Sequence, residues 1–391
     1  MHRSFIARNP SVLIFLAILA LFTLGVTVLS EGFGIGLIST SFVKVLGKTL
    51  CLCLIAIAMD LIWGYAGILS LGHFAFFGLG GYMIGMWLMY ERTRQIVVNA
   101  LSDGVLPPTP EEITAGIGNQ IFGVVGSSDF PLIWAFADSL VLQLAFVVLV
   151  PGILALVFGW LAFRSRVTGV YLSILTQAMT LGLSLYLFQN ASGLRGNNGL
   201  SGLQNLPGIT APQSVVSLWF FWASALALGL GYLLVAWVVS GKFGSVIRGI
   251  RDNEARVRFL GYSVETYKLA VFTLTACISG IAGALYYPQA GIINPAEVAP
   301  IASIYLAVWV AIGGRGRLYG AVIGTAFVSL VSSWFTGGQA PDVPLGFYTV
   351  KWVDWWLVLL GLSFVLVTLY APNGIGGLID LLKRKRKETQ P

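Results

Sequence analysis

Charged side chains are scarce in this sequence. Asp, Glu, Lys and Arg make up 10% of the 391 residues and apolar residues make up 57%, whereas soluble domains carry roughly 25% charged residues. The mean hydropathy of +0.85 spreads this apolar excess over the whole chain, which excludes a soluble enzyme with one anchor helix. The net charge of +7 lies between apolar blocks and forms no basic face interleaved with aromatics, so nucleic acid is not an expected partner. The composition predicts a protein of the lipid membrane.

Residues for metal binding and catalysis are equally few. The three cysteines, Cys51, Cys53 and Cys277, lie in apolar runs without metal-ligand spacing, and we interpret them as apolar fillers. The two histidines, His2 and His73, belong to no HExxH motif, and no serine stands in a GxSxG setting. We therefore expect no catalytic residue, no metal and no cofactor.

The sequence also lacks an energy source of its own. The fragment nearest to a nucleotide-binding loop, 47–49, has Phe42 where that loop needs its first glycine, so the chain is not expected to hydrolyse ATP. Ion-coupled carriers usually need acidic side chains near the middle of the membrane. Here Asp60, Asp138 and Asp354 lie toward the ends of their apolar runs. The energy for any transport should therefore come from another subunit.

Continuous apolar windows recur along the chain. A bilayer core of about 30 Å requires about 20 apolar residues per helix, and windows without a period of two favour helices over a barrel. The windows are 11–30, 45–63, 67–90, 134–162, 168–188, 215–239, 267–287, 300–313, 318–336 and 352–371. We predict an all-α polytopic membrane protein in which residues 1–391 form one transmembrane domain of about ten transmembrane helices. The first window is too long for a signal peptide, so it should be an uncleaved span.

The distribution of Lys and Arg predicts the orientation. With the N-terminus in the cytoplasm, the inner segments hold 17 basic residues and the outer segments hold 6, as the positive-inside rule requires. Both termini are then cytoplasmic, and the basic tail 383–391 lies at the inner lipid surface. Two extracytoplasmic loops, 91–133 and 189–214, are long enough to be docking surfaces, although they could equally be solvated connectors.

The longest inner segment, 240–266, has an amphipathic pattern. Its apolar positions recur at helical spacing, at Val246, Ile247, Ile250, Val257 and Leu260. We predict a short helix along the inner face that ends at Gly261. Its mixed charge favours docking to a protein partner, and a loop that touches lipid headgroups is the alternative.

Polar residues within the spans are mostly uncharged. The span that contains His73 is crowded with glycines, which allow either close helix packing or a break that exposes backbone groups to a pore. For His73 itself a packed, neutral imidazole is favoured over a substrate ligand. The side chains of Ser173, Thr176, Gln177, Thr180 and Ser184 share one helix face. This stripe could line a path for a small uncharged solute, or it could join helices through hydrogen bonds.

Four motifs in order along the chain resemble the permeases of branched-chain amino acid ABC importers. They are the glycine-rich block 64–82, the cytoplasmic 250–255 with Gly261, the run 280–286 and the segment 312–320. The resemblance runs from about residue 45 to the C-terminus. Within that family the chain is most similar to the permeases of urea importers, because of its long outer loop, its Asn-rich stretch 188–203, and Arg315 and Arg317.

The resemblance implies a bacterial inner-membrane complex. Its partners would be a second homologous permease, two cytoplasmic ATPase subunits that hydrolyse ATP, and an extracytoplasmic solute-binding protein. The family's coupling segment maps onto Arg248, Arg251, Asp252, Asn253, Glu254, Ala255 and Gly261. As a hypothesis, the translocation path is lined by Ser70, His73, Phe74 and Phe77 together with the stripe from Ser173 to Ser184. The alternatives are a branched-chain amino acid cargo, or a stand-alone channel or secondary carrier for a small neutral solute.

Overall fold

The computed structural model describes residues 10–102, 109–123, 130–167, 169–337, 343–344, 349–370 and 374–377. The helices are α2 (Pro10–Leu29), α3 (Thr40–Asp60), η1 (Leu61–Tyr65), α4 (His73–Leu101), α5 (Pro110–Phe122), η3 (Leu132–Trp134), α6 (Leu140–Arg164), α7 (Val170–Phe188), η4 (Asn190–Ser192), η5 (Gly196–Asn198), α8 (Gln213–Ser240), α9 (Lys242–Phe259), α10 (Val264–Ala290), η6 (Pro295–Val298), α11 (Pro300–Gly313), α12 (Leu318–Thr336) and α13 (Trp352–Tyr370). Two short antiparallel pairs join β1 (Leu200–Ser201) to β2 (Ile292–Ile293) and β3 (Val343–Pro344) to β4 (Thr349–Val350). The all-α prediction is confirmed.

Seven stretches of the described chain are long and apolar enough to cross a membrane: α2, α3 with η1, α6, α7, α8, α10 and α12. They coincide with seven of the ten predicted windows. The other three windows also contain helices, α4, α11 and α13, which fall short of that standard. Glycines and His73 dilute the apolarity of α4, and the 14 residues of α11 span only about 21 Å at 1.5 Å per residue. The figure of ten spans therefore remains a prediction.

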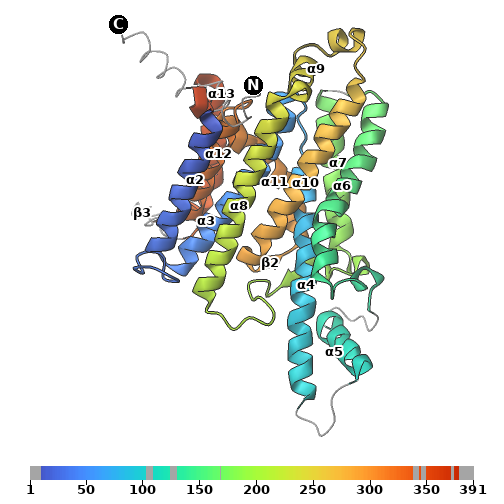
Figure 1. Cartoon of the computed structure of the whole chain (residues 1–391), viewed down its shortest axis with the longest axis vertical. Coiled ribbons are helices and arrows are strands. Elements are labelled where there is room, and N and C mark those ends of the chain that lie inside the picture. Colours follow the sequence, from blue (N-terminus) through green and yellow to red (C-terminus); the bar gives the residue numbers. More distant parts are fainter. Residues whose placement is uncertain are drawn as a thin grey trace, which may run out of the picture.

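The window 67–90 was predicted as a span that starts at residue 67, and this start is wrong. After the π-helical turn η1, residues 66–72 form no helix, and α4 begins only at His73. At its other end α4 continues to Leu101 and is followed by α5, so the segment 91–133 is largely a helical hairpin. Figure 1 shows this hairpin beyond the rest of the bundle, at the end opposite α9.

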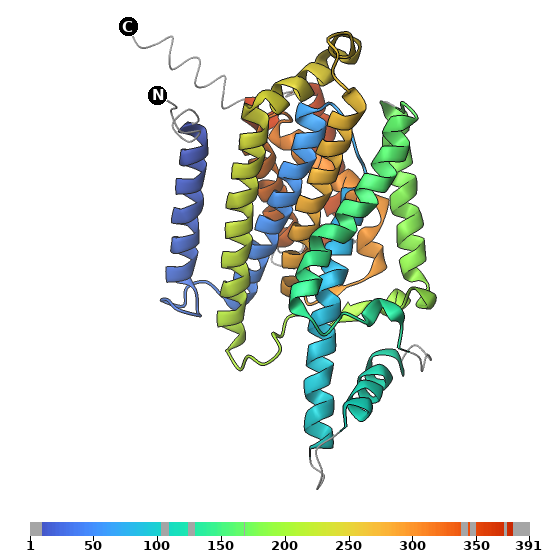
Figure 2. The ribbon, with the colours of Figure 1, turned by 45° about the vertical axis from the view of Figure 1, so that its right-hand side comes forward.

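Helix α3 lies at the centre of the bundle. Its apolar window is 89% buried, against 11% for α2, because α8, α10 and α12 all pack against it. Besides α3, helix α10 also contacts α4 and α6 (Figure 2). Small residues permit this close approach, since a side chain at Gly80 would overlap the backbone of Gly280.

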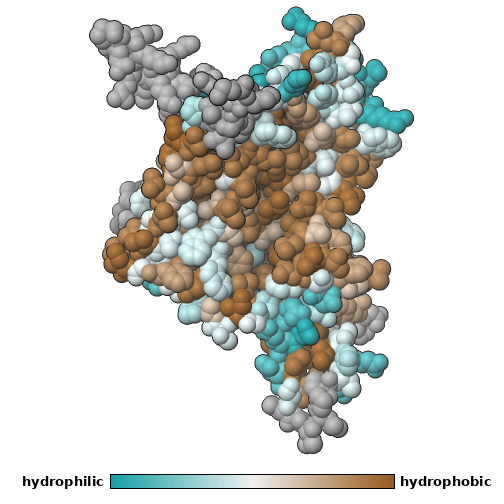
Figure 3. All heavy atoms as spheres, in the orientation of Figure 1, coloured by the Kyte–Doolittle hydropathy of each residue, from teal (hydrophilic) through white to brown (hydrophobic). Residues whose placement is uncertain are grey.

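Exposed apolar side chains cover the outer helices. Leu21 of α2, Leu226 of α8 and Leu366 of α13 are among them, and Figure 3 shows a hydrophobic band with hydrophilic residues gathered beyond it, on both sides. An exposed apolar surface of this extent suits lipid contact. The arrangement is that of a multi-pass membrane protein.

Candidate functional site

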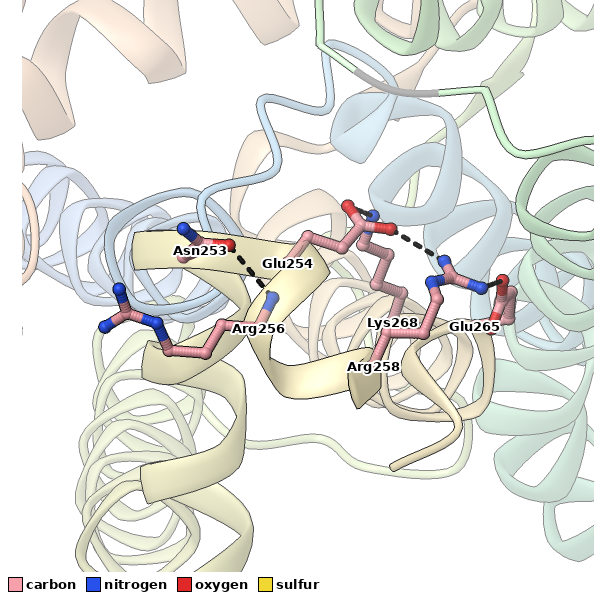
Figure 4. Close-up of polar contacts among 6 residues, drawn as sticks. All are labelled: Asn253, Glu254, Arg256, Arg258, Glu265 and Lys268. Carbon is pink, nitrogen blue, oxygen red and sulfur yellow. Dashed lines mark hydrogen bonds and ion pairs between the residues drawn. The ribbon is translucent and has the colours of Figure 1, made fainter. Parts of the chain in front are cut away.

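The segment α9 is two short helices rather than one. Asn253 has φ −160° and ψ 95°, which interrupts the helix. Its side-chain Oδ1 accepts a hydrogen bond from the N–H of Arg256 at 3.0 Å (Figure 4), so Asn253 caps the second helix. Gly261 ends that helix with φ +88°, in the left-handed region that favours glycine. The predicted helix and its predicted end are both present, and the kink was not foreseen.

The apolar face of α9 is buried as predicted, except at the C-terminal end of the helix. Ile247, Ile250 and Val257 are buried as expected, and Ile250 and Val257 pack against Val264. Leu260 was expected on the same buried face but is 71% exposed, and Phe259 beside it is 92% exposed. The prediction for Leu260 is wrong because the helix ends at Phe259, so Leu260 lies in the terminal turn before Gly261 and outside the cluster around Val264. The turn presents two large apolar side chains outward.

Ion pairs fasten the second helix of α9 to the beginning of α10. The Arg258 guanidinium donates to Glu265 at 2.6 Å and to Glu254 at 3.0 Å, and Lys268 donates to Glu254 at 2.6 Å (Figure 4). The hydrogen bonds from Arg258 to Glu265 and Glu254 raise the pKa of Arg258 above its ordinary value. Lys268 is only 8% exposed, and Glu254 accepts its hydrogen bond.

A polar cluster connects α9 to the centre of the bundle. Arg251 donates through Nη1 to the carbonyl of Gly64 at 2.8 Å and through Nε to Asp252 at 3.0 Å. The buried carboxylate of Asp60 accepts a hydrogen bond from the N–H of Gly316 at 2.6 Å. Three of the four sequence motifs, 64–82, 250–255 and 312–320, therefore meet at one place. Sequence reasoning missed Asp60 as the link, although an acid within an apolar span was a signal that could have found it.

The remaining residues of the predicted coupling segment lie on the same surface. Arg248 is partly buried, while Asp252, Asn253, Ala255 and Gly261 are exposed. A cavity of about 240 Å³ separates α9 from the non-helical segment, and it is lined by Gly67, Ile68, Arg251, Asn253, Glu254 and Lys268 among others. The surface is thus exposed, mixed in charge, and in direct contact with the helix break.

Side chains of α7 hold the non-helical segment 66–72 in place. The Thr176 hydroxyl accepts a hydrogen bond from the N–H of Leu71 at 3.0 Å, and Ser173 donates to the carbonyl of Leu69 at 2.7 Å. The Ser303 hydroxyl accepts from the N–H of Phe74 at 3.1 Å. Backbone groups freed by the break are satisfied in this way, as a membrane interior requires.

The other predicted path residues differ in burial and in their hydrogen-bond partners. Ser70, His73, Phe74 and Phe77 are buried, and the rings of Phe74 and Phe77 are 5.1 Å apart. Thr180 donates to the carbonyl of Thr176, Ser184 donates to the carbonyl of Pro295 in η6, and Gln177 is partly exposed. Hydrogen bonding between elements therefore occupies Ser173, Thr176 and Ser184, and the lining role stays a prediction.

Charge is almost absent from the buried part of the described chain. Asp60 and Lys268 are the buried charged residues there. Both belong to the α9 end, where each has a hydrogen-bond partner. The polar groups deeper in the bundle are hydroxyls, amides and one imidazole. These fully buried groups can hydrogen-bond a solute, and the charged Glu297 of η6, which interacts with Tyr287 and Lys48, is partly buried.

Comparisons with known proteins place these features in context. Residues 41–368 match the family model described as "Branched-chain amino acid transport system / permease component". The high-affinity branched-chain amino acid transport system permease protein LivM of Escherichia coli K12 is 21% identical over 318 residues, which cover 76% of this chain and 64% of LivM. LivM of Salmonella typhimurium gives the same figures. The autoinducer 2 import system permease protein LsrC of E. coli DH10B is 28% identical over 187 residues, covering 46% and 53% of the two chains. No solved structure matches significantly.

Proposed function

Because this chain belongs to the family of branched-chain amino acid transport system permease components, we propose that it is the membrane subunit of an ATP-driven, binding-protein-dependent importer. The family makes the chain a transport component rather than an enzyme. In the proposed complex, two ATPase subunits dock at the α9 end, a second homologous permease completes the translocation path, and a solute-binding protein delivers the cargo. The match with this chain covers about 64% of the length of LivM and 53% of LsrC.

The observation that carries the proposal is the outward-facing end of α9. Phe259 and Leu260 are largely exposed, although the segment is braced from within by Glu254, Glu265 and Lys268. Large apolar side chains held outward on a rigid support are typical of an anchor that fills a pocket on a partner. Force on this anchor would pass through Arg251 to Gly64 and to the helix break.

Urea is the cargo that we propose. Its support is the fully buried polar residues around the helix break, such as Ser70 and Thr176, which are uncharged hydrogen-bonding groups, and the resemblance to urea permeases in the segment that holds Arg315 and Arg317. The LivM relatives are named for branched-chain amino acids and LsrC for autoinducer 2, so an amino acid cargo is the competing hypothesis.

Uptake of labelled urea in cells lacking this chain, and then complemented, tests the cargo. We expect loss and recovery of urea uptake that excess leucine does not inhibit. Normal urea uptake in the deletion strain, with leucine uptake lost, would overturn the cargo and leave the importer architecture standing.

The docking of ATPase subunits is tested by Phe259→Asp, with Phe33→Asp as a control at an exposed aromatic on the loop after α2. We expect Phe259→Asp to abolish co-purification of the ATPase and urea uptake, while the control retains both. Uptake that persists in Phe259→Asp without any ATPase would favour a stand-alone channel.

A further inference from the structure

A second cavity lies at the α9 end, between the last turn of α6 and the first turns of α10. Its volume is about 450 Å³, and its walls include Trp160, Phe163, Arg164, Arg166, Arg258 and Leu269. Three guanidinium groups and two aromatic rings therefore face one space. Neither the polar cluster around Asp60 nor the cavity beside Gly67 includes these α6 residues.

The charges in this cavity do not cancel. Arg258 is neutralised by its ion pairs with Glu265 and Glu254. Arg164 stacks over the ring of Trp160, with the guanidinium carbon 5.1 Å from the ring centre. Within the described ranges the Arg166 side chain makes no hydrogen bond or ion pair, although its charge interacts with that of Glu265, which also lines the cavity. The lining thus carries three guanidinium groups against one carboxylate, so an excess of positive charge remains for a ligand.

The backbone at Arg166 gives an independent indication that this side chain is used. The N–H of Arg166 donates to the carbonyl of Phe163, and the N–H of Val167 donates to the carbonyl of Ala162. These two bonds form a Schellman motif, whose left-handed position normally holds glycine. Arg166 occupies it with φ +55°, at a conformational cost that glycine would avoid.

The cavity lies where the apolar surface of α6 ends. Leu156, Trp160 and Leu161 on the preceding turns are each about half exposed, and α6 is a candidate membrane span that ends at Arg164. Tryptophan and arginine at the end of a span are typical of the zone of lipid headgroups. A ligand there would meet apolar walls on one side and guanidinium groups on the other.

We propose that this cavity binds an anionic phospholipid of the membrane face on which α9 lies. The phosphate would accept hydrogen bonds from Arg164 and Arg166, because guanidinium groups match phosphate oxygens in geometry and charge. The glycerol and acyl carbons would contact Trp160 and Leu269. The bound lipid would sit beside the ion pairs that fasten α9 to α10.

The test uses the full chain in nanodiscs of phosphatidylcholine with and without phosphatidylglycerol, with retained lipid measured by native mass spectrometry. Arg166→Gly removes the guanidinium from a backbone position that suits glycine, so the variant should fold at least as well as wild type. We expect retained phosphatidylglycerol to fall about tenfold, because the variant loses one charge-assisted hydrogen bond to the lipid phosphate. Arg164→Gln should act in the same direction, and Arg94→Gln, on α4, should have no effect.

Three results would overturn the proposal. The first is an Arg166→Gly variant that retains phosphatidylglycerol as wild type does. The second is equally tight binding of soluble glycerol 3-phosphate, which would assign the cavity to a free phosphate ester. The third is unchanged lipid retention with loss of the co-purified ATPase, which would make the cavity part of a protein interface.

Discussion

A methyl group at position 64 is expected to disconnect α9 from the helix break. A Cβ added at Gly64 would overlap the Asp60 carboxylate and the Gly316 nitrogen, and it would lie 2.8 Å from the Gly316 Cα. Backbone atoms cannot rotate away as a flexible side chain can. The turn that contains Gly316 must therefore shift in a Gly64→Ala variant, and the hydrogen bond between Gly316 and Asp60 is broken.

The loss of stability expected for Gly64→Ala follows from the steric overlap and from the broken hydrogen bond. Overpacking a tight site costs about 1–3 kcal/mol, and leaving a buried hydrogen-bonding group without its partner costs about 1–3 kcal/mol. The two effects share the same atoms, so they need not add fully. We expect a loss of about 2–5 kcal/mol in the free energy of unfolding.

Gly182 provides a matched control. It lies within α7, and no atom lies within 4 Å of the position that an added methyl group would occupy, so alanine should stabilise this helix interior by about 0.5–1 kcal/mol. Thermal unfolding of both variants in one detergent, followed by tryptophan fluorescence, measures the difference. Urea uptake should be lost in Gly64→Ala and retained in Gly182→Ala. Equal melting temperatures and equal uptake in the two variants would refute the reasoning.

Three further predictions concern single interactions. Thr176→Val keeps the side-chain shape but leaves the Leu71 N–H unpaired, so thermal unfolding should show a loss of about 1–3 kcal/mol in the free energy of unfolding. Joint replacement of Thr176, Gln177 and Thr180 by Ala should lower urea uptake. Unchanged uptake in that triple variant would count against the proposed path. Glu254→Gln leaves the buried Lys268 without its counter-charge, so it should destabilise the protein. The double variant with Lys268→Met should recover most of the loss in a double-mutant cycle. Hydrogen bonds from Thr109 lower the pKa of Glu112 below its ordinary 4.5, so the cap of α5 is present above that pH and is lost as the pH falls through the lowered value. Proteolysis within α5 should rise in that acidic range, and Glu112→Gln should remove most of the dependence.

The elements that sequence reasoning located are those set by local signals. Apolar windows found the helices because burial in lipid needs only length and hydropathy. Gly261 was recognisable as a helix end because its left-handed backbone favours glycine. The start of α5 carries a local signal of the same kind, since Thr109 and Glu112 form a capping box with Pro110 between them.

Features that depend on distant partners could not be predicted in this way. The break at 66–72 is stable because Ser173 and Thr176, about a hundred residues away, hold its backbone. The polar stripe on α7 was correctly placed on one face, but nothing local distinguishes a pore lining from hydrogen bonds between helices. The exposure of Leu260 depends on where α9 ends, at Phe259, and the helical spacing of the apolar residues does not register that end.

The same long-range contacts explain how the α9 surface and the interior are linked. Arg251 donates to Gly64, and its aliphatic stem lies over Gly67, where an added Cβ would come within 2.7 Å of the Arg251 Cγ. Leu69 and Leu71 then connect the same segment to α7. Since Leu69 and Leu71 hydrogen-bond to side chains of α7 instead of continuing a helix, this segment can change shape at a lower cost than a continuous helix. A displacement of α9 would therefore reach the buried polar residues through Arg251, which would place the proposed coupling surface and the proposed solute path on opposite sides of one short, deformable segment.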